Sequence, residues 1–254
     1  MNLKQIFLYV MLAGVLLMTA KPLMASDGAI KLSSDPWRPW VLGNEGEPAQ
    51  GGWAVDIARE IFARLNKPVE INIYPYERCL YQMKTGERDV LLMAKKNPER
   101  EQFMLFTDVV ASDPQLFYFD SAHKPAFQWT TWSDLKGYKV GVVRGFDYGP
   151  FRSEAKKHGV HVEEVSDELQ NIRKLMAGRL DLIILNRSTA VYFKQSNPAS
   201  SANLKSADKA VTNAQFHYAL SKKGAAAPLL AQMNDAIRQM KADGTIQRII
   251  GKEN

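Results

Sequence analysis

The stretch Met83-Lys-Thr-Gly-Glu-Arg-Asp-Val-Leu-Leu-Met-Ala94 has a counterpart 92 residues later, Leu175-Met-Ala-Gly-Arg-Leu-Asp-Leu-Ile-Ile-Leu-Asn186. Each copy contains the end of a helix, a glycine in the position of a helix-terminating residue, an aspartate and an uninterrupted apolar run. A helix, a glycine and a buried strand recur in many α/β proteins, so this pair alone is weak evidence for a repeat. The elements that precede each copy decide the question.

The segments upstream of both copies follow the same order of strand, helix, strand, helix and strand. These elements are predicted at residues 29–34, 53–66, 69–74, 78–85 and 90–93, and again at 139–143, 150–158, 160–165, 169–177 and 182–185. Apolar strands that alternate with helices indicate parallel sheets covered on both faces. The sequence therefore predicts two similar α/β lobes, each with its own parallel sheet.

The C-terminal residues, 216–254, are too few for a third lobe and must pack onto one of the two. If they return to the first lobe, the chain crosses between the lobes at 111–115 and at 209–215, and two crossings form a hinge. The expected lobes are then 26–110 with 216–254, and 116–208. Open α/β sheets bind ligands at the carboxyl ends of their strands, so the cleft between the lobes is the expected site.

The N-terminal residues 1–25 have the pattern of an export signal. Lys4 precedes the apolar run Ile6–Ala20, which is shorter than the roughly 20 residues that span a bilayer as a helix, and small residues follow. We expect cleavage after Ala25, with Ala20 as the alternative. The sole cysteine, Cys79, is far from this point, so we expect a soluble periplasmic protein without a lipid anchor.

Composition excludes several classes of protein. The formal net charge of +6 is spread along the chain, with no basic run that could follow a phosphate backbone, so nucleic acid is not an expected partner. One cysteine cannot form an intramolecular disulfide, and the four histidines lack the spacing of a zinc site. We expect neither a metal nor another cofactor.

Six segments of the chain resemble a known family. They are Ser34–Trp40, Gly51–Ala58, Gly86–Asp89, Asn97–Asp108, Asp134–Gly145 and Asn234–Ile250. Together they resemble family 3 of the bacterial periplasmic solute-binding proteins, the receptors of polar amino-acid ABC importers. The resemblance implies an α/β, two-lobed clamshell of periplasmic-binding-protein type II, a monomer that captures a small polar, carboxylated solute. It also implies a partner, either an inner-membrane permease or a sensor or chemoreceptor.

The resemblance assigns roles to three residues of the first lobe. Arg100 matches the arginine that pairs with the ligand's α-carboxylate, a role that suits its planar guanidinium. Trp37 and Tyr76 match aromatic positions that enclose the ligand's apolar part. From the residues alone, a solvated arginine and core aromatics remain the alternatives.

The turn Gly145-Phe146-Asp147-Tyr148 lies between a predicted strand and a predicted helix. Its backbone N–H groups, at a helix N-terminus, favour an anion. Gly145, Phe146 and Tyr148 are therefore candidate ligand contacts, although many strand-to-helix turns contain glycine.

Two departures from the family pattern concern the charge of the ligand. Asn186 stands where amino-acid binders present an aspartate to the ligand's ammonium, and an amide brings no charge. Lys95, Lys96 and Arg100, with Arg144 across the cleft, would favour a ligand more anionic than a zwitterion, unless the two lysines are simply solvated. A dicarboxylate, another organic acid or a modified amino acid is therefore as plausible as a standard amino acid.

A periplasmic enzyme on the same scaffold, similar to a dehydratase, is the alternative function, and a ligand-sensing input is another. Glu77 and Asp147 are the carboxylates at the cleft edge that could act as general acid or base. Neither lies in a recognisable catalytic motif, so we expect a binding protein rather than an enzyme.

Overall fold

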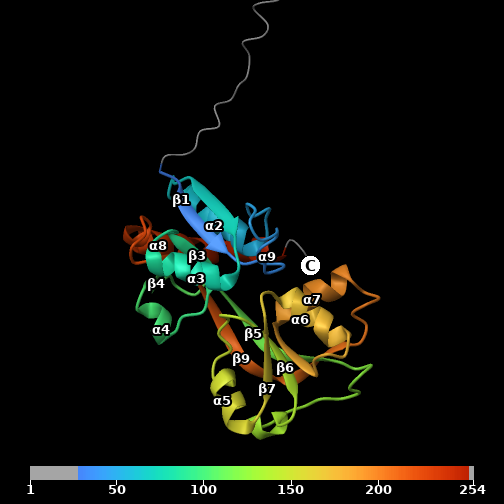
Figure 1. Ribbon diagram of the computed structural model, residues 1–254. Coiled ribbons are helices and arrows are strands. Elements are labelled where there is room, and N and C mark those ends of the chain that lie inside the picture. The colour runs from blue at the N-terminus through green and yellow to red at the C-terminus, as the bar shows by residue number, and fades with distance from the viewer. Residues whose placement is uncertain (1–27, 252–254) are drawn as a thin grey trace, which may run out of the picture.

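Two α/β lobes joined by two long strands make up the structure, a computed structural model that describes residues 28–251 (Figure 1). The predicted export signal at residues 1–25 lies outside the described residues.

The first lobe is built around three parallel strands. β1 (Ile30–Ser34) lies between β2 (Val69–Ile73) and β3 (Val90–Ala94). α2 (Trp53–Arg64) connects β1 to β2, and α3 (Tyr76–Thr85) connects β2 to β3. Apolar residues recur in α2 at intervals of three and four, so one face of the helix packs into the core.

The second lobe repeats this arrangement. β6 (Lys139–Val143) lies between β7 (His161–Val165) and β8 (Leu182–Asn186), and all three are parallel. α5 (Phe151–His158) and α6 (Glu168–Met176) make the two connections. A glycine with positive φ follows both α3 and α6, as the sequence predicted. The predicted repeat is thus confirmed in its element order.

Two antiparallel strands run between the lobes (Figure 1), and the sequence did not predict their length. β9 (Leu204–Ser221) pairs with β3 and with β4 (Met104–Phe106) in the first lobe and with β5 (Ala111–Asp120) in the second, while β5 also pairs with β8. The prediction of two separate parallel sheets is therefore wrong, because one nine-stranded sheet is continuous through β9 and β5. The expected crossings at 111–115 and 209–215 lie within paired strands, not in loops.

The remaining helices lie outside the repeat. They are α4 (Pro98–Glu101), η1 (Trp132–Leu135), α7 (Arg187–Ser196), η2 (Ala227–Leu229), α8 (Leu230–Ala242) and α9 (Thr245–Gly251). α8 and α9 pack against α2, so the C-terminal helices complete the core of the first lobe. Within residues 28–251 we find no helix with the length and apolarity needed to cross a membrane.

Gly52 holds the loop after β1 against the start of α2. Its φ is 106°, and a Cβ placed there would stand 2.5 Å from the carbonyl oxygen of Trp40, which is backbone and cannot move aside. We expect Gly52→Ala to lower the free energy of unfolding by about 2–4 kcal/mol, because overpacking adds to the strain of a positive φ. Urea unfolding measures this. Gly51→Ala is the matched control, since a Cβ there meets no atom within 4 Å, and an equal loss in both variants would contradict the steric argument.

Candidate functional site

The predicted site residues meet at a cavity between the lobes, at the carboxyl ends of β1, β3 and β8. Six of them line it: Trp37, Tyr76, Lys95, Arg100, Phe146 and Asn186. The cavity volume is about 20 Å³. Because roughly 10–15 Å³ accommodates one water molecule, this space is too small for a solute the size of an amino acid.

Arg100 is a buried cation that reaches across the cleft. Asn97 caps α4 by accepting a hydrogen bond from the Arg100 backbone N–H at 2.9 Å, and this cap sets the direction of the side chain. The guanidinium donates to the carbonyl of Lys95 at 2.8 Å and, in the other lobe, to the carbonyl of Gly145 at 3.0 Å. It also lies 5.3 Å from the centre of the Tyr76 ring. These two bonds use two of the five guanidinium N–H donors.

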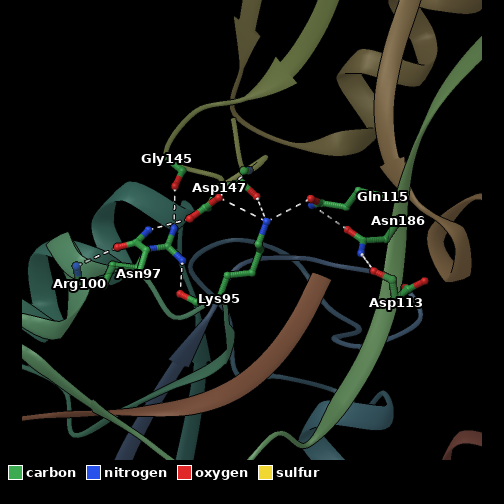
Figure 2. Close-up of polar contacts among 9 residues, drawn as sticks. Lys95, Asn97, Arg100, Asp113, Gln115, Gly145, Asp147 and Asn186 are labelled. Atoms are coloured by element: carbon green, nitrogen blue, oxygen red, sulfur yellow. Dashed lines mark hydrogen bonds and ion pairs between the residues drawn. The ribbon is translucent and has the colours of Figure 1, made fainter. Parts of the chain in front are cut away.

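An ion pair joins the lobes beside this arginine (Figure 2). Lys95 Nζ lies 3.3 Å from Asp147 Oδ1 and donates to the Asp147 carbonyl at 2.8 Å, while Asn97 Nδ2 donates to Asp147 Oδ2 at 2.7 Å. Burial raises the pKa of Asp147, but the Asn97 hydrogen bond and the Lys95 charge outweigh it, so the net pKa is lowered. Asp147 is consequently ionised at neutral pH.

Asp35 is a site residue that the sequence analysis missed. It follows β1 directly, lines the cavity and is 6% exposed. Burial raises its pKa to about 7, although its own backbone N–H and the charge of Arg100 oppose the shift. Within residues 28–251, no other residue donates a hydrogen bond to this carboxyl group. Its place immediately after a strand, inside the family-like segment Ser34–Trp40, was the available signal.

Two of the four expected cations lie outside the cavity. Lys96 is half exposed and forms an ion pair with Glu101 at 2.9 Å. Arg144 is also half exposed, and its Nε lies 3.5 Å from Glu164. Lys95 and Arg100 do line the cavity. The carboxyl groups of Asp147 and Asp35 line it with them. The charge of the cavity is therefore balanced only when Asp35 is ionised, above its raised pKa of about 7, and in that state the structure does not favour an anionic ligand over a zwitterion.

The amide of Asn186 is held by its neighbours in the second lobe. Its Nδ2 donates to the Asp113 carbonyl at 3.2 Å, and its Oδ1 accepts from Gln115 Nε2 at 3.4 Å (Figure 2). Gln115 pairs with Asn186 in the sheet and also lines the cavity, and the sequence analysis did not single it out. Asn186 thus contributes a fixed, uncharged wall.

Aromatic rings cover the apolar sides of the cavity. Tyr76 and Phe146 meet edge to face across the cleft with centroids 5.0 Å apart, and Trp37 lies 4.8 Å from Phe216. Tyr148, in contrast, is buried in the core of the second lobe, where its hydroxyl accepts a hydrogen bond from a strand N–H.

Gly145 brings the second lobe close to the first. Its φ is 77°, and a Cβ there would stand 3.1 Å from Glu77 Cγ and 3.3 Å from the Tyr76 ring. Its carbonyl accepts a hydrogen bond from Arg100, and the contact of its N–H group with an anion stays a prediction.

Two lobes of one construction, joined by two strands and meeting at a polar cavity, define a type II periplasmic-binding-protein clamshell. Solved structures agree. An ancestral arginine-binding protein bound to arginine superposes with a TM-score of 0.77 at 24% identity, covering 89% of this chain and 97% of that one. An ancestral amino acid-binding protein, described as a precursor of cyclohexadienyl dehydratase, gives 0.73 at 20% identity, covering 89% and 95%. At these identities the likeness establishes the fold alone.

Sequence comparison supports the resemblance to family 3. Residues 30–128 match the bacterial extracellular solute-binding proteins, family 3. The L-cystine-binding protein of Escherichia coli K12 is 33% identical over 48% of this chain and 44% of its own length, so the chain spans less than half of that relative. The histidine-binding periplasmic protein of Salmonella typhimurium is 26% identical over 88% of this chain and 86% of its own. Residues 30–128 thus match the family that the resemblance predicted.

Proposed function

We propose that the protein reversibly captures a small zwitterionic solute between its two lobes. The solute is an amino acid, whose carboxylate and cationic group are both bound by the protein. One observation supports this most directly: a buried arginine and a buried carboxyl group without a partner side chain, Arg100 and Asp35, line the same aromatic cavity. The two sequence relatives described above are named for amino acids, which agrees with this class.

The charged groups have complementary roles in the proposal. Arg100 binds the carboxylate of the solute with its remaining N–H donors, and Asp35 binds the cationic group that Asn186 cannot neutralise. Trp37 and Tyr76 cover the apolar part. Micromolar affinity, about 8 kcal/mol, is sufficient for a scavenging receptor.

Opening and closing of the lobes gives the solute access. The proposed hinge lies at 111–115 and 209–215, where β5 and β9 pass between the lobes, with 26–110 and 216–254 on one side and 116–208 on the other. The proposed setting is the periplasm. An inner-membrane ABC permease, or a sensor, then binds the closed form of the monomer.

An enzyme on the same scaffold is the second candidate function, and one observation favours it. The pKa of Asp35, about 7, lies in the range that a general acid uses at neutral pH. Of the carboxylates predicted from the sequence, Asp147 is held ionised and Glu77 lines an outer groove instead of the cavity. Recovery of unchanged solute after incubation, measured by NMR, separates binding from turnover.

A thermal-shift screen of residues 26–254 tests the proposed function. The panel contains arginine, histidine, cystine, glutamate, succinate and simple amines at millimolar concentration. A solute at about 100 times its dissociation constant adds roughly 2.7 kcal/mol, which corresponds to about 5–10 °C for a chain of this size. We expect the largest shift with one of the amino acids, because each has both a carboxylate and a cationic group. A shift with succinate alone would contradict the zwitterion proposal.

A further inference from the structure

Two tryptophans of the first lobe reach the second lobe on another side of the cavity from Lys95. Both lie in the loop after β1. Trp37 Nε1 donates to Thr189 Oγ1 at 2.9 Å, and Trp40 Nε1 donates to Ser188 Oγ at 2.8 Å. The two hydroxyl residues are adjacent in the first turn of α7, so the loop of one lobe docks onto one helix end of the other.

Each hydroxyl group also contacts a buried carboxyl group of the second lobe. Ser188 Oγ donates to Asp113 Oδ2 at 2.5 Å, and the Thr189 side chain lies close to the Glu168 carboxyl group. A hydroxyl group has one proton and two lone pairs. Ser188 donates its proton to Asp113, so its lone pairs are left for the indole N–H of Trp40, and the second lobe presents an oriented acceptor there.

We propose that Trp40 and Ser188, with Trp37 and Thr189, form a latch that favours the closed arrangement of the lobes whatever solute is bound. Trp40 and Ser188 do not line the cavity, so they act as positioning residues. All donors and acceptors of the latch belong to the protein. The latch therefore raises the fraction of closed molecules even when no solute is bound. The inference rests on the proposed opening of the lobes, but not on the identity of the solute.

The latch affects affinity through this population. A solute that binds only the closed form has an apparent dissociation constant that rises as the closed fraction falls. One hydrogen bond of ordinary strength changes the ratio of closed to open molecules by about 3- to 10-fold.

Trp40→Phe and Ser188→Ala test the latch. The first removes the indole N–H and keeps an aromatic ring, and the second removes the acceptor. Trp53→Phe is the matched control, because Trp53 packs edge-on against Trp40 at 5.0 Å and its buried Nε1 has no hydrogen-bond partner within residues 28–251. It therefore removes an indole N–H from the same cluster without removing a bond between lobes.

The readout is the distance between spin labels on the two lobes, measured without added solute. Labels at Lys67→Cys and Lys136→Cys are exposed, one on each lobe, and the native Cys79 is buried. We expect the ratio of short to long distances to fall about 3- to 10-fold in each latch variant, to fall little further in the double variant, and to stay unchanged in Trp53→Phe. Far-ultraviolet circular dichroism verifies that each variant is folded.

Two results would overturn the latch in different ways. If the unmodified protein shows both distances and the latch variants leave their ratio unchanged, the latch is wrong while the opening of the lobes stands. If one short distance persists in every variant and at every solute concentration, the lobes do not open, and the proposed function fails together with the latch.

Discussion

Replacing Arg100 by alanine is expected to weaken solute binding by about 2–5 kcal/mol, the usual effect of removing one partner of a buried charge pair. Arg100 is 5% exposed, and it is the cavity cation whose planar fork matches a carboxylate. Its loss leaves the solute's carboxylate buried without a full counter-charge. Isothermal titration calorimetry with the best solute of the thermal-shift screen measures the change.

The same variant also removes a contact between the lobes, the bond to the Gly145 carbonyl. Arg144→Ala is the control, because that arginine is half exposed and pairs with Glu164 outside the cavity, and exposed ion pairs contribute about 0–1 kcal/mol. Equal affinities for Arg100→Ala and the unmodified protein would refute the carboxylate role. A loss restored by Arg100→Lys would assign the effect to charge alone rather than to the geometry of the fork.

The elements of each lobe are predictable because local patterns determine them. The helix periodicity of α2, the glycines after α3 and α6 and the apolar runs of β3 and β8 are all visible in consecutive residues. The antiparallel strands β5 and β9 were not predicted at full length, since their stability comes from pairing with partners about a hundred residues away. No local pattern distinguishes such a strand from a linker.

Some features of the candidate site could likewise be predicted from the sequence, and others could not. Residues beside strong motifs, such as Arg100 after Asn97-Pro98, were found and do line the cavity. The ion pairing of Lys96 and Arg144 could not be anticipated, because it depends on where Glu101 and Glu164 lie in the fold. The burial of Asp35 could not be anticipated either. In the sequence it is an ordinary acidic residue, and its pKa is raised only because both lobes enclose it.

Asp35→Asn is expected to stabilise the solute-free protein at pH 8 and to weaken binding of a cationic amino acid at the same pH. The pKa of Asp35 is raised from 3.8 to about 7, so between these values the folded protein holds a proton that the unfolded chain releases. The contribution of Asp35 to stability is full below the unfolded pKa and is lost as the pH rises through the folded pKa. Asparagine does not titrate, so the variant gains about 2–4 kcal/mol relative to the unmodified protein at pH 8, given about 1.4 kcal/mol for each pKa unit.

Binding changes in the opposite direction if the carboxylate serves the solute. A cationic group pairs with ionised Asp35, so the affinity of the unmodified protein should rise from pH 5 to pH 8 and binding near pH 6 should release a proton, which calorimetry in buffers of different ionisation enthalpy detects. Asp35→Asn should bind the same solute with an affinity that no longer depends on pH in this range. A variant that gains stability and loses binding at pH 8 assigns the buried charge to the solute, because the charge of Arg100 alone does not offset the burial of Asp35. A variant that gains stability and keeps its affinity shows instead that the solute does not pair with Asp35. The cationic group of the solute must then be bound elsewhere.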